Sequence, residues 1–167
     1  KGNRTVENTH DTSGVLTRTV GYAYDLRNRL SQINLAGDIT QVVHDAVGNL
    51  TSETDPNNHG TTHQYDALNR LFKTVNALSQ ETTYGQDAND RPTVVTAPNT
   101  LSTQYSYDDL GNLLGETSPD RGTTVYAHDG AGNVRTVTDA RNITTTYTYD
   151  ALNRVSVQQS SATGTAR

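Results

Sequence analysis

Evenly spaced carboxylates are the side chains of this sequence best suited to chemistry. An aspartate recurs at every twenty-first position from Asp45 to Asp150. Asp25 lies 20 positions before Asp45, and Asp11 begins a shortened unit before Asp25. Stacked carboxylates could bind calcium, as they do in calcium-binding repeats. Each repeat offers one carboxylate, however, and a calcium site needs several oxygen ligands. Turn capping is therefore the favoured role, and no metal or other cofactor is expected. The aspartates concerned are Asp25, Asp45, Asp66, Asp87, Asp108, Asp129 and Asp150.

Histidines are the second group that could do chemistry, as metal ligands or general bases. His10, His44 and His128 lie directly before an aspartate of the series, and His63 lies three residues before one. Other repeats hold tyrosine at these positions, so we interpret the four histidines as substitutes for tyrosine. His59 falls in a connecting loop. The sequence has no Gly-x-Ser-x-Gly motif and no phosphate-binding glycine motif, so we do not expect an enzyme.

The residues around each aspartate predict the elements that position it. β-branched and aromatic residues alternate with other residues just before it, as in 144–149, which is typical of a strand. The third residue after it is always Gly, Asn or Asp, the types that tolerate a left-handed backbone. This pattern predicts a type I turn closed by a G1 bulge, so that each repeat is a β-hairpin. The left-handed positions are Gly14, Asn28, Gly48, Asn69, Asp90, Gly111, Gly132 and Asn153.

The nine tyrosines keep the same register as the aspartates. Each lies one or three residues before an aspartate, and residues two apart in a strand share one face of the sheet. We therefore expect ladders of stacked rings across the sheet, and we expect these ladders to be the core. They consist of Tyr22, Tyr24, Tyr65, Tyr84, Tyr105, Tyr107, Tyr126, Tyr147 and Tyr149.

These patterns together predict an all-β fold, an antiparallel meander of about 14 to 16 strands. Clusters of Pro, Gly, Asn and Asp at 55–60, 97–99, 118–122 and 139–142 predict the connections between hairpins. The repeat array is expected at 8–157, as about seven to eight units, between a lead-in at 1–7 and a polar tail at 158–167. Pro92 follows a degenerate unit and predicts an edge or irregular strand there.

Composition excludes several classes of protein. Only 32% of residues are hydrophobic, and Cys, Met and Trp are absent, which makes a conventional close-packed core hard to build. Disorder is the alternative, but the strict register of the tyrosines argues against it. The net charge of −5 and the lack of a Lys/Arg run argue against nucleic-acid binding, and no apolar run is long enough to span a membrane. The start at Lys1 leads us to expect a piece of something longer.

The repeat phrases carry a family resemblance. Residues 147–154, 105–112 and 22–25 strongly resemble the YD repeats of the Rhs (rearrangement hotspot) family, and the likeness covers roughly residues 8–157. Related arrays occur in insecticidal toxin-complex proteins and in teneurins, while the Asp-Ala-Leu-Asn-Arg phrase is similar to bacterial Rhs proteins. The resemblance implies a hairpin ribbon that spirals into a hollow β-shell around a C-terminal toxin. Some members self-cleave at an aspartate-based site, but no segment of this sequence matches that region.

Two functions from different classes follow from these observations. The first is a non-enzymatic shell segment of an Rhs-type polymorphic toxin, with the rest of the shell, the enclosed toxin and a type VI secretion component as implied partners. Such a protein would be a secreted or delivered bacterial effector that is cytoplasmic before delivery. The alternative is an extracellular glycan-binding or adhesive surface, because exposed tyrosines beside Asp, Asn and Arg can stack on sugars. We also expect the isolated chain to oligomerise or aggregate through its unpaired end strands.

Overall fold

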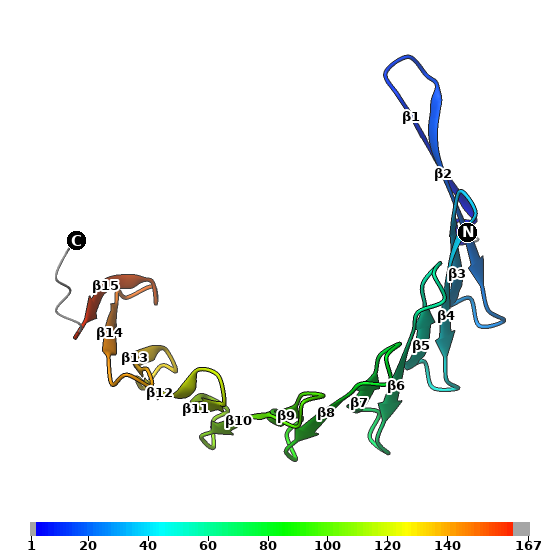
Figure 1. Cartoon of the computed structure of the whole chain (residues 1–167). Coiled ribbons are helices and arrows are strands. Elements are labelled where there is room, and N and C mark those ends of the chain that lie inside the picture. The colour runs from blue at the N-terminus through cyan, green and yellow to red at the C-terminus, as the bar shows by residue number, and fades with distance from the viewer. Residues whose placement is uncertain (1–2, 162–167) are drawn as a thin grey trace. The chain divides into compact units, whose positions relative to one another are not determined.

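A computed structural model describes residues 3–161 (Figure 1). The regular elements in this range are β-strands, and each is an antiparallel neighbour of the next in the order β1 to β15. The all-β meander predicted from the sequence is therefore confirmed. In the described range no helix is long and apolar enough to cross a membrane. The strands are β1 (Val6–His10), β2 (Leu16–Tyr24), β3 (Leu30–Leu35), β4 (Asp38–His44), β5 (Leu50–Thr54), β6 (Gly60–Tyr65), β7 (Leu71–Val75), β8 (Glu81–Gln86), β9 (Pro92–Thr96), β10 (Ser102–Tyr107), β11 (Leu113–Ser118), β12 (Gly122–His128), β13 (Val134–Thr138), β14 (Thr144–Tyr149) and β15 (Val155–Ser160).

The chain divides into two compact units, 1–83 and 84–167, with the boundary inside β8. The first unit is a meander of hairpins from β1 to β7, and the second continues the same hairpin pattern from β9 to β15. The last strand runs to Ser160, three residues beyond the end expected for the array at 157. Residues 162–167 of the expected polar tail lie outside the described residues.

The hairpins contain the bulge that the sequence predicts. β6 and β7 pair residue by residue from Thr62 to Gln64, and the register then shifts at Gln64/Tyr65, immediately before Asp66. The same shift occurs between β12 and β13 at Ala127/His128. All eight predicted left-handed positions have positive φ, from 57° at Asn153 to 112° at Gly48. The backbone therefore turns in the predicted way at every repeat.

Two kinds of connection alternate along the meander. Aspartate turns lie between β2 and β3 and between every second pair of strands thereafter, and they begin at Asp25, Asp45, Asp66, Asp87, Asp108, Asp129 and Asp150. Return turns lie between β1 and β2 and between every second pair thereafter, and they begin at Asp11, Asn34, Asp55, Asn76, Ala97, Ser118 and Asp139. Asp11 was expected to begin a shortened copy of the aspartate series. It lies instead at the opposite end of β2 from Asp25, and so belongs to the return turns.

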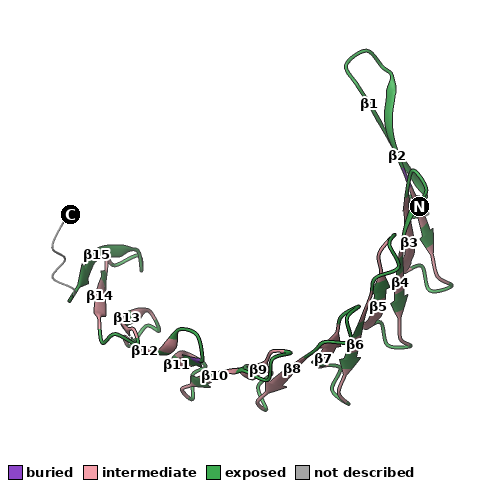
Figure 2. Cartoon of the chain, in the orientation of Figure 1, coloured by how far each residue is buried: buried purple, intermediate pink, exposed green. Residues whose placement is uncertain are grey.

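The sheet is a single layer, and this corrects the expectation that tyrosine ladders form the core. Among the described residues only Val20 and Ser118 are buried, with 5% and 7% of their surface exposed. Within the described residues of each unit the tyrosines are half-buried, shielded by their neighbours in the sheet (Figure 2). Stability must therefore come from contacts within the sheet and not from a close-packed interior.

Pro92 is accommodated without an edge strand. It is the first residue of β9, where a proline does not interrupt the hydrogen bonds of the strand that follows. β9 lies between β8 and β10 in the strand order, and Val94 to Thr96 pair regularly with β10. Of the two interpretations of Pro92, an edge strand or an irregular strand, the edge strand is therefore wrong.

Candidate functional site

The aspartate turn is a closed hydrogen-bond unit, and the turn at Asp66 shows its parts. The backbone N–H of Asp66 donates to the carbonyl of Arg70 at 2.9 Å, and the N–H of Asn69 donates to the carbonyl of Asp66 at 3.0 Å. Asp66 Oδ1 accepts the N–H groups of Leu68 and Arg70 at 2.8 and 3.0 Å. The second oxygen, Oδ2, accepts Nε of Arg70 at 2.8 Å. Both carboxylate oxygens are thus engaged within the turn.

The same unit recurs with one permitted variation. The residue four positions after the aspartate is arginine or asparagine in every aspartate turn, and its side chain donates to Oδ2 at distances such as 2.7 Å from Arg154 and 2.8 Å from Asn112. No role for this position was predicted from the sequence. Its restriction to two residue types with a side-chain N–H donor was the available signal. The set is Arg29, Asn49, Arg70, Arg91, Asn112, Asn133 and Arg154.

These hydrogen bonds stabilise the charged carboxylates. The pKa of Asp25 is lowered to about 2, chiefly by the backbone N–H of Arg29, while partial burial opposes the shift and the Arg29 side chain adds to it. The pKa of Asp66 is lowered by the backbone N–H of Arg70 and then by its side chain. At Asp129 the amide of Asn133 is the largest cause of the lowered pKa. A general acid or base needs a pKa near the working pH, and these carboxylates are shifted in the opposite direction.

The side chain at the fourth position also joins one turn to the next. Arg29 Nη1 donates to the carbonyl of Asp45 at 2.6 Å, and Arg91 Nη1 donates to that of Asp108 at 3.0 Å. Where asparagine replaces arginine, Nδ2 of Asn49 donates to Oδ1 of Asn69 at 3.0 Å. In each case the bond runs forward to the following aspartate turn. This position therefore closes its own turn and links neighbouring hairpins.

The return turns repeat at the same period, and sequence analysis recognised them only in part. From Asn34 to Asp139, their first residues recur at every twenty-first position, as the aspartates do. At Asp55 the carboxylate accepts the N–H groups of Asn57 and His59 at 2.9 and 2.8 Å, as in an aspartate turn. Asn76 plays the same role in a turn that was not predicted. The spacing was the missed signal, because the first residue varies in type and the left-handed residue includes Ser79 and Thr100.

The tyrosine face is built from the strands that precede the aspartates. In β12, Tyr126 and His128 are half-buried on this face, whereas Val125 and Ala127 on the other face are exposed. The hydroxyl of Tyr65 donates to the carbonyl of Leu50, the first residue of the preceding strand, at 2.9 Å. At the equivalent positions Tyr149 donates to Val134 at 2.7 Å. Tyr24 donates to Arg4 at 2.8 Å. These tyrosine hydroxyls therefore form hydrogen bonds between one strand and the backbone that precedes it in the sheet.

Three of the four histidines predicted to substitute for tyrosine follow the register of the tyrosines; His10 is exposed and precedes the return turn at Asp11, so the prediction for it is wrong. His44, His63 and His128 are half-buried on the tyrosine face, and Nδ1 of His63 lies 3.3 Å from Oγ1 of Thr74. Nε2 of His63 and Nδ1 of His128 are buried without a hydrogen-bond partner among the described residues. No group of three His, Cys, Asp or Glu side chains within residues 3–161 is arranged to hold a metal ion. His59 is engaged by Asp55 in a return turn at 3.1 Å.

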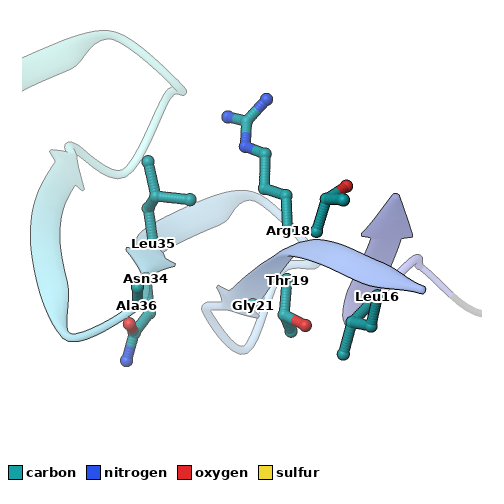
Figure 3. A pocket seen from close by; sticks show the side chains of 8 residues that line it. Leu16, Arg18, Thr19, Gly21, Asn34, Leu35 and Ala36 are labelled. Carbon is teal, nitrogen blue, oxygen red and sulfur yellow. The ribbon is translucent and has the colours of Figure 1, made fainter. Parts of the chain in front are cut away.

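The opposite face carries hydroxyls, and an open groove lies at the N-terminal end of the sheet. Threonines pair across strands on this face, with Oγ1 atoms of Thr138 and Thr144 2.9 Å apart. Near the N-terminal end a groove of about 560 Å³ lies beside β2 and β3, where Leu16, Leu35 and Asn34 line it (Figure 3). The groove arises because β2 pairs with β3 only from Val20 onward. Its lining residues lie in the described range and include no carboxylate or imidazole.

The geometry defines a protein of repeated β-hairpins whose polar side chains mostly stabilise turns and join strands. The RHS Repeat family matches residues 44–81, 87–123 and 128–166, more than half of the chain, and the chain therefore belongs to this family. A comparison with curated proteins gave no match.

Solved structures share the fold. The crystal structure of TcdB2-TccC3-Cdc42 is similar with a TM-score of 0.75 and 17% identity, over 92% of this chain and 10% of that chain. The Tc holotoxin pore of Photorhabdus luminescens is similar with a TM-score of 0.73 and 17% identity, over 91% of this chain and 10% of that chain. A TcdB2-TccC3 structure without the hypervariable C-terminal region has a TM-score of 0.62 and 19% identity, over 88% of this chain and 8% of that chain. The chain thus spans 10% or less of the length of these structures.

Proposed function

We propose that the chain is a wall segment of a hollow β-shell that encloses a toxin domain of the same parent protein. Family membership and the shared fold with TcdB2-TccC3 proteins support this proposal. One of the similar structures is described as a TcdB2-TccC3 protein without its hypervariable C-terminal region, and such a region is the kind of segment a shell could enclose. In this proposal the parent is a toxin delivered to another cell. Delivery by a type VI secretion system stays a prediction from the sequence.

The observation that carries the proposal is a sheet that is held together without a core. Only two of the described residues are buried, yet each hairpin is bonded to the next through its strands, and several turns are bonded to the turn that follows. The link from Arg29 to Asp45 and the link from Tyr65 to Leu50 are examples. A sheet stabilised in this lateral way needs no filled interior. It can therefore act as a wall with empty space on one side.

We propose a non-catalytic role for the repeat aspartates. Their carboxylates accept backbone and side-chain hydrogen bonds within the turn, and their pKa values are lowered. A carboxylate used in this way positions the backbone and has little capacity left to bind a substrate or transfer a proton. The chemistry of the parent protein then resides in the enclosed domain.

Limited proteolysis of the full parent protein tests the container role. The native protein and a variant whose repeat array carries a site-specific protease site would be digested in parallel, and the fragments identified by mass spectrometry. A container protects the non-repeat C-terminal segment until the array itself is cut. Digestion of that segment at the same rate in the native and array-cut proteins would overturn the proposal. The glycan-binding alternative would then be tested with immobilised oligosaccharides.

A further inference from the structure

Exposed leucine or valine side chains occupy the tips of five of the seven aspartate turns, while the turns at Asp87 and Asp129 carry Asn89 and Ala131. Leu68 is 70% exposed, Leu110 88% and Leu152 72%, and each is the second residue after its aspartate. Val47 holds the same position at 71%, and Leu26, one residue after Asp25, is fully exposed. Turn tips are normally polar, so a large apolar residue repeated at one position requires an explanation. Neither turn closure nor hairpin pairing uses these side chains.

The return turns carry a second apolar row at the same period. The residue after the first position of the return turn is proline or alanine in five successive turns, and each of these residues is exposed. They are Pro56, Ala77, Pro98, Pro119 and Ala140. Leu78 extends the row and is 77% exposed. Within each unit, the two ends of the strands therefore present matching apolar rows.

We propose that the aspartate-turn tips are a docking surface for the return-turn tips of another run of the same repeat array. In the parent protein that run belongs to the adjacent winding of the wall, and between separate molecules it belongs to a second copy. This inference rests on the proposed function for the arrangement in the parent. The row at one end would fill the spaces of the row at the other end, so that successive windings seal against each other.

The interval between the turn tips favours another run of the repeat array as the docking partner. Consecutive aspartate turns are separated by two strands, which places their tips about 10 Å apart. A partner with the same interval can put an apolar group against each tip that carries leucine or valine, and the return turns of this chain have that interval. The similar structures are about ten times as long as this chain, since the aligned region covers 10% of them. A parent protein of comparable length would have room for further runs of the array.

The aspartate-turn tips carry few charges. Among the three residues that follow each aspartate in the aspartate turns, the charged ones are Arg27, Asp90 and Asp109. Two adjacent aspartate turns contain Asp90 and Asp109. Two adjacent return turns contain Arg121 and Arg141, and Asp120 lies beside Arg121 in the first of them. The side chains of the two arginines remain about three-quarters exposed, at 73% and 77%, despite their ion pairs within the chain. A contact between these tips would bring opposite charges together at its rim.

Cysteine cross-linking provides a direct test because the sequence contains no cysteine. Leu68→Cys and Ala77→Cys variants of the chain, carrying different tags, would be mixed and oxidised. The two positions lie at opposite ends of their strands, so a disulfide between them must join two molecules. Val43→Cys, 51% exposed on a strand face, replaces Ala77→Cys in the control mixture. The proposal predicts mixed disulfides between Leu68→Cys and Ala77→Cys well in excess of those with Val43→Cys.

Sedimentation velocity on tip variants completes the test. Self-association of the chain should weaken by roughly tenfold for each leucine changed to serine at positions 68 and 110, because each loses most of one buried side chain. Equal cross-linking in both mixtures, or self-association that the serine variants leave unchanged, would overturn the docking surface. Association through unpaired end strands gives that second result. Loss of the docking surface would not contradict the container role tested by proteolysis, since a wall can enclose a domain without apolar contacts between its windings.

Discussion

Replacing Gly132 with valine tests the turn that defines the repeat. Gly132 has φ of +84°, and a Cβ added to it would lie 3.5 Å from Oδ1 of Asn112, which is ordinary contact. The cost therefore comes from the backbone and not from a clash. A non-glycine residue held in this region costs about 1–3 kcal/mol, and a β-branched residue is expected at the upper end. For a chain of this length, the melting temperature should fall by about 2–4 °C for each kcal/mol.

Two variants of the same turn serve as controls. Gly130 lies two residues earlier, has no positive φ, and a Cβ added to it would meet no atom within 4 Å. Gly130→Val should therefore leave the free energy of unfolding almost unchanged. Gly132→Asn should also be tolerated, because Asn69 and Asn153 occupy the equivalent position with φ of 62° and 57°.

Urea unfolding followed by circular dichroism measures the three variants against the parent chain. The expected order of stability is the parent chain, Gly130→Val and Gly132→Asn together, with Gly132→Val clearly below them. If Gly132→Val and Gly130→Val lose the same free energy, the left-handed turn does not determine the stability of the hairpin. A loss confined to Gly132→Asn would contradict the same reasoning.

Three further predictions concern the turn carboxylates and the tyrosine face. Tyr65→Phe should cost about 0.5–1.5 kcal/mol in urea unfolding because it removes the hydrogen bond to Leu50. Tyr105→Phe should cost less, since its hydroxyl has no partner among the described residues, and equal losses would refute this role. The folded pKa of Asp25 is depressed to about 2, so the free energy of unfolding should be constant above the unfolded pKa of aspartate. It should fall as the pH drops from about 4 toward 2. A urea midpoint that rises on acidification would contradict this prediction. Millimolar calcium should leave the melting temperature unchanged, and a clear rise would restore the calcium interpretation of the aspartates.

The aspartate turns were predictable because a narrow set of residue types performs each task. Aspartate accepts the N–H groups, Gly, Asn or Asp takes the left-handed position, and the chain repeats this choice seven times. The return turns use the same geometry with less consistent residues. Thr100, a β-branched residue with φ of 65°, is an example that turn preferences do not predict. Their regular spacing was visible in the sequence, but it had to be sought independently of residue type.

Burial was harder to predict than topology. The register of the tyrosines correctly placed them on one face, but the sequence does not say whether a second layer covers that face. The link from Arg29 to Asp45 was also missed, because no role was predicted for the position four residues after the aspartate, either in its own turn or between turns. Side chains with two partners in different repeats become evident only when the hairpins are placed side by side.

A density map of the parent protein by electron cryomicroscopy tests the central claim most directly. A container predicts that the repeat array forms a continuous wall with separate density for the non-repeat segment inside it. An array that forms an open ribbon, with the non-repeat segment outside or on its outer surface, would contradict the container role.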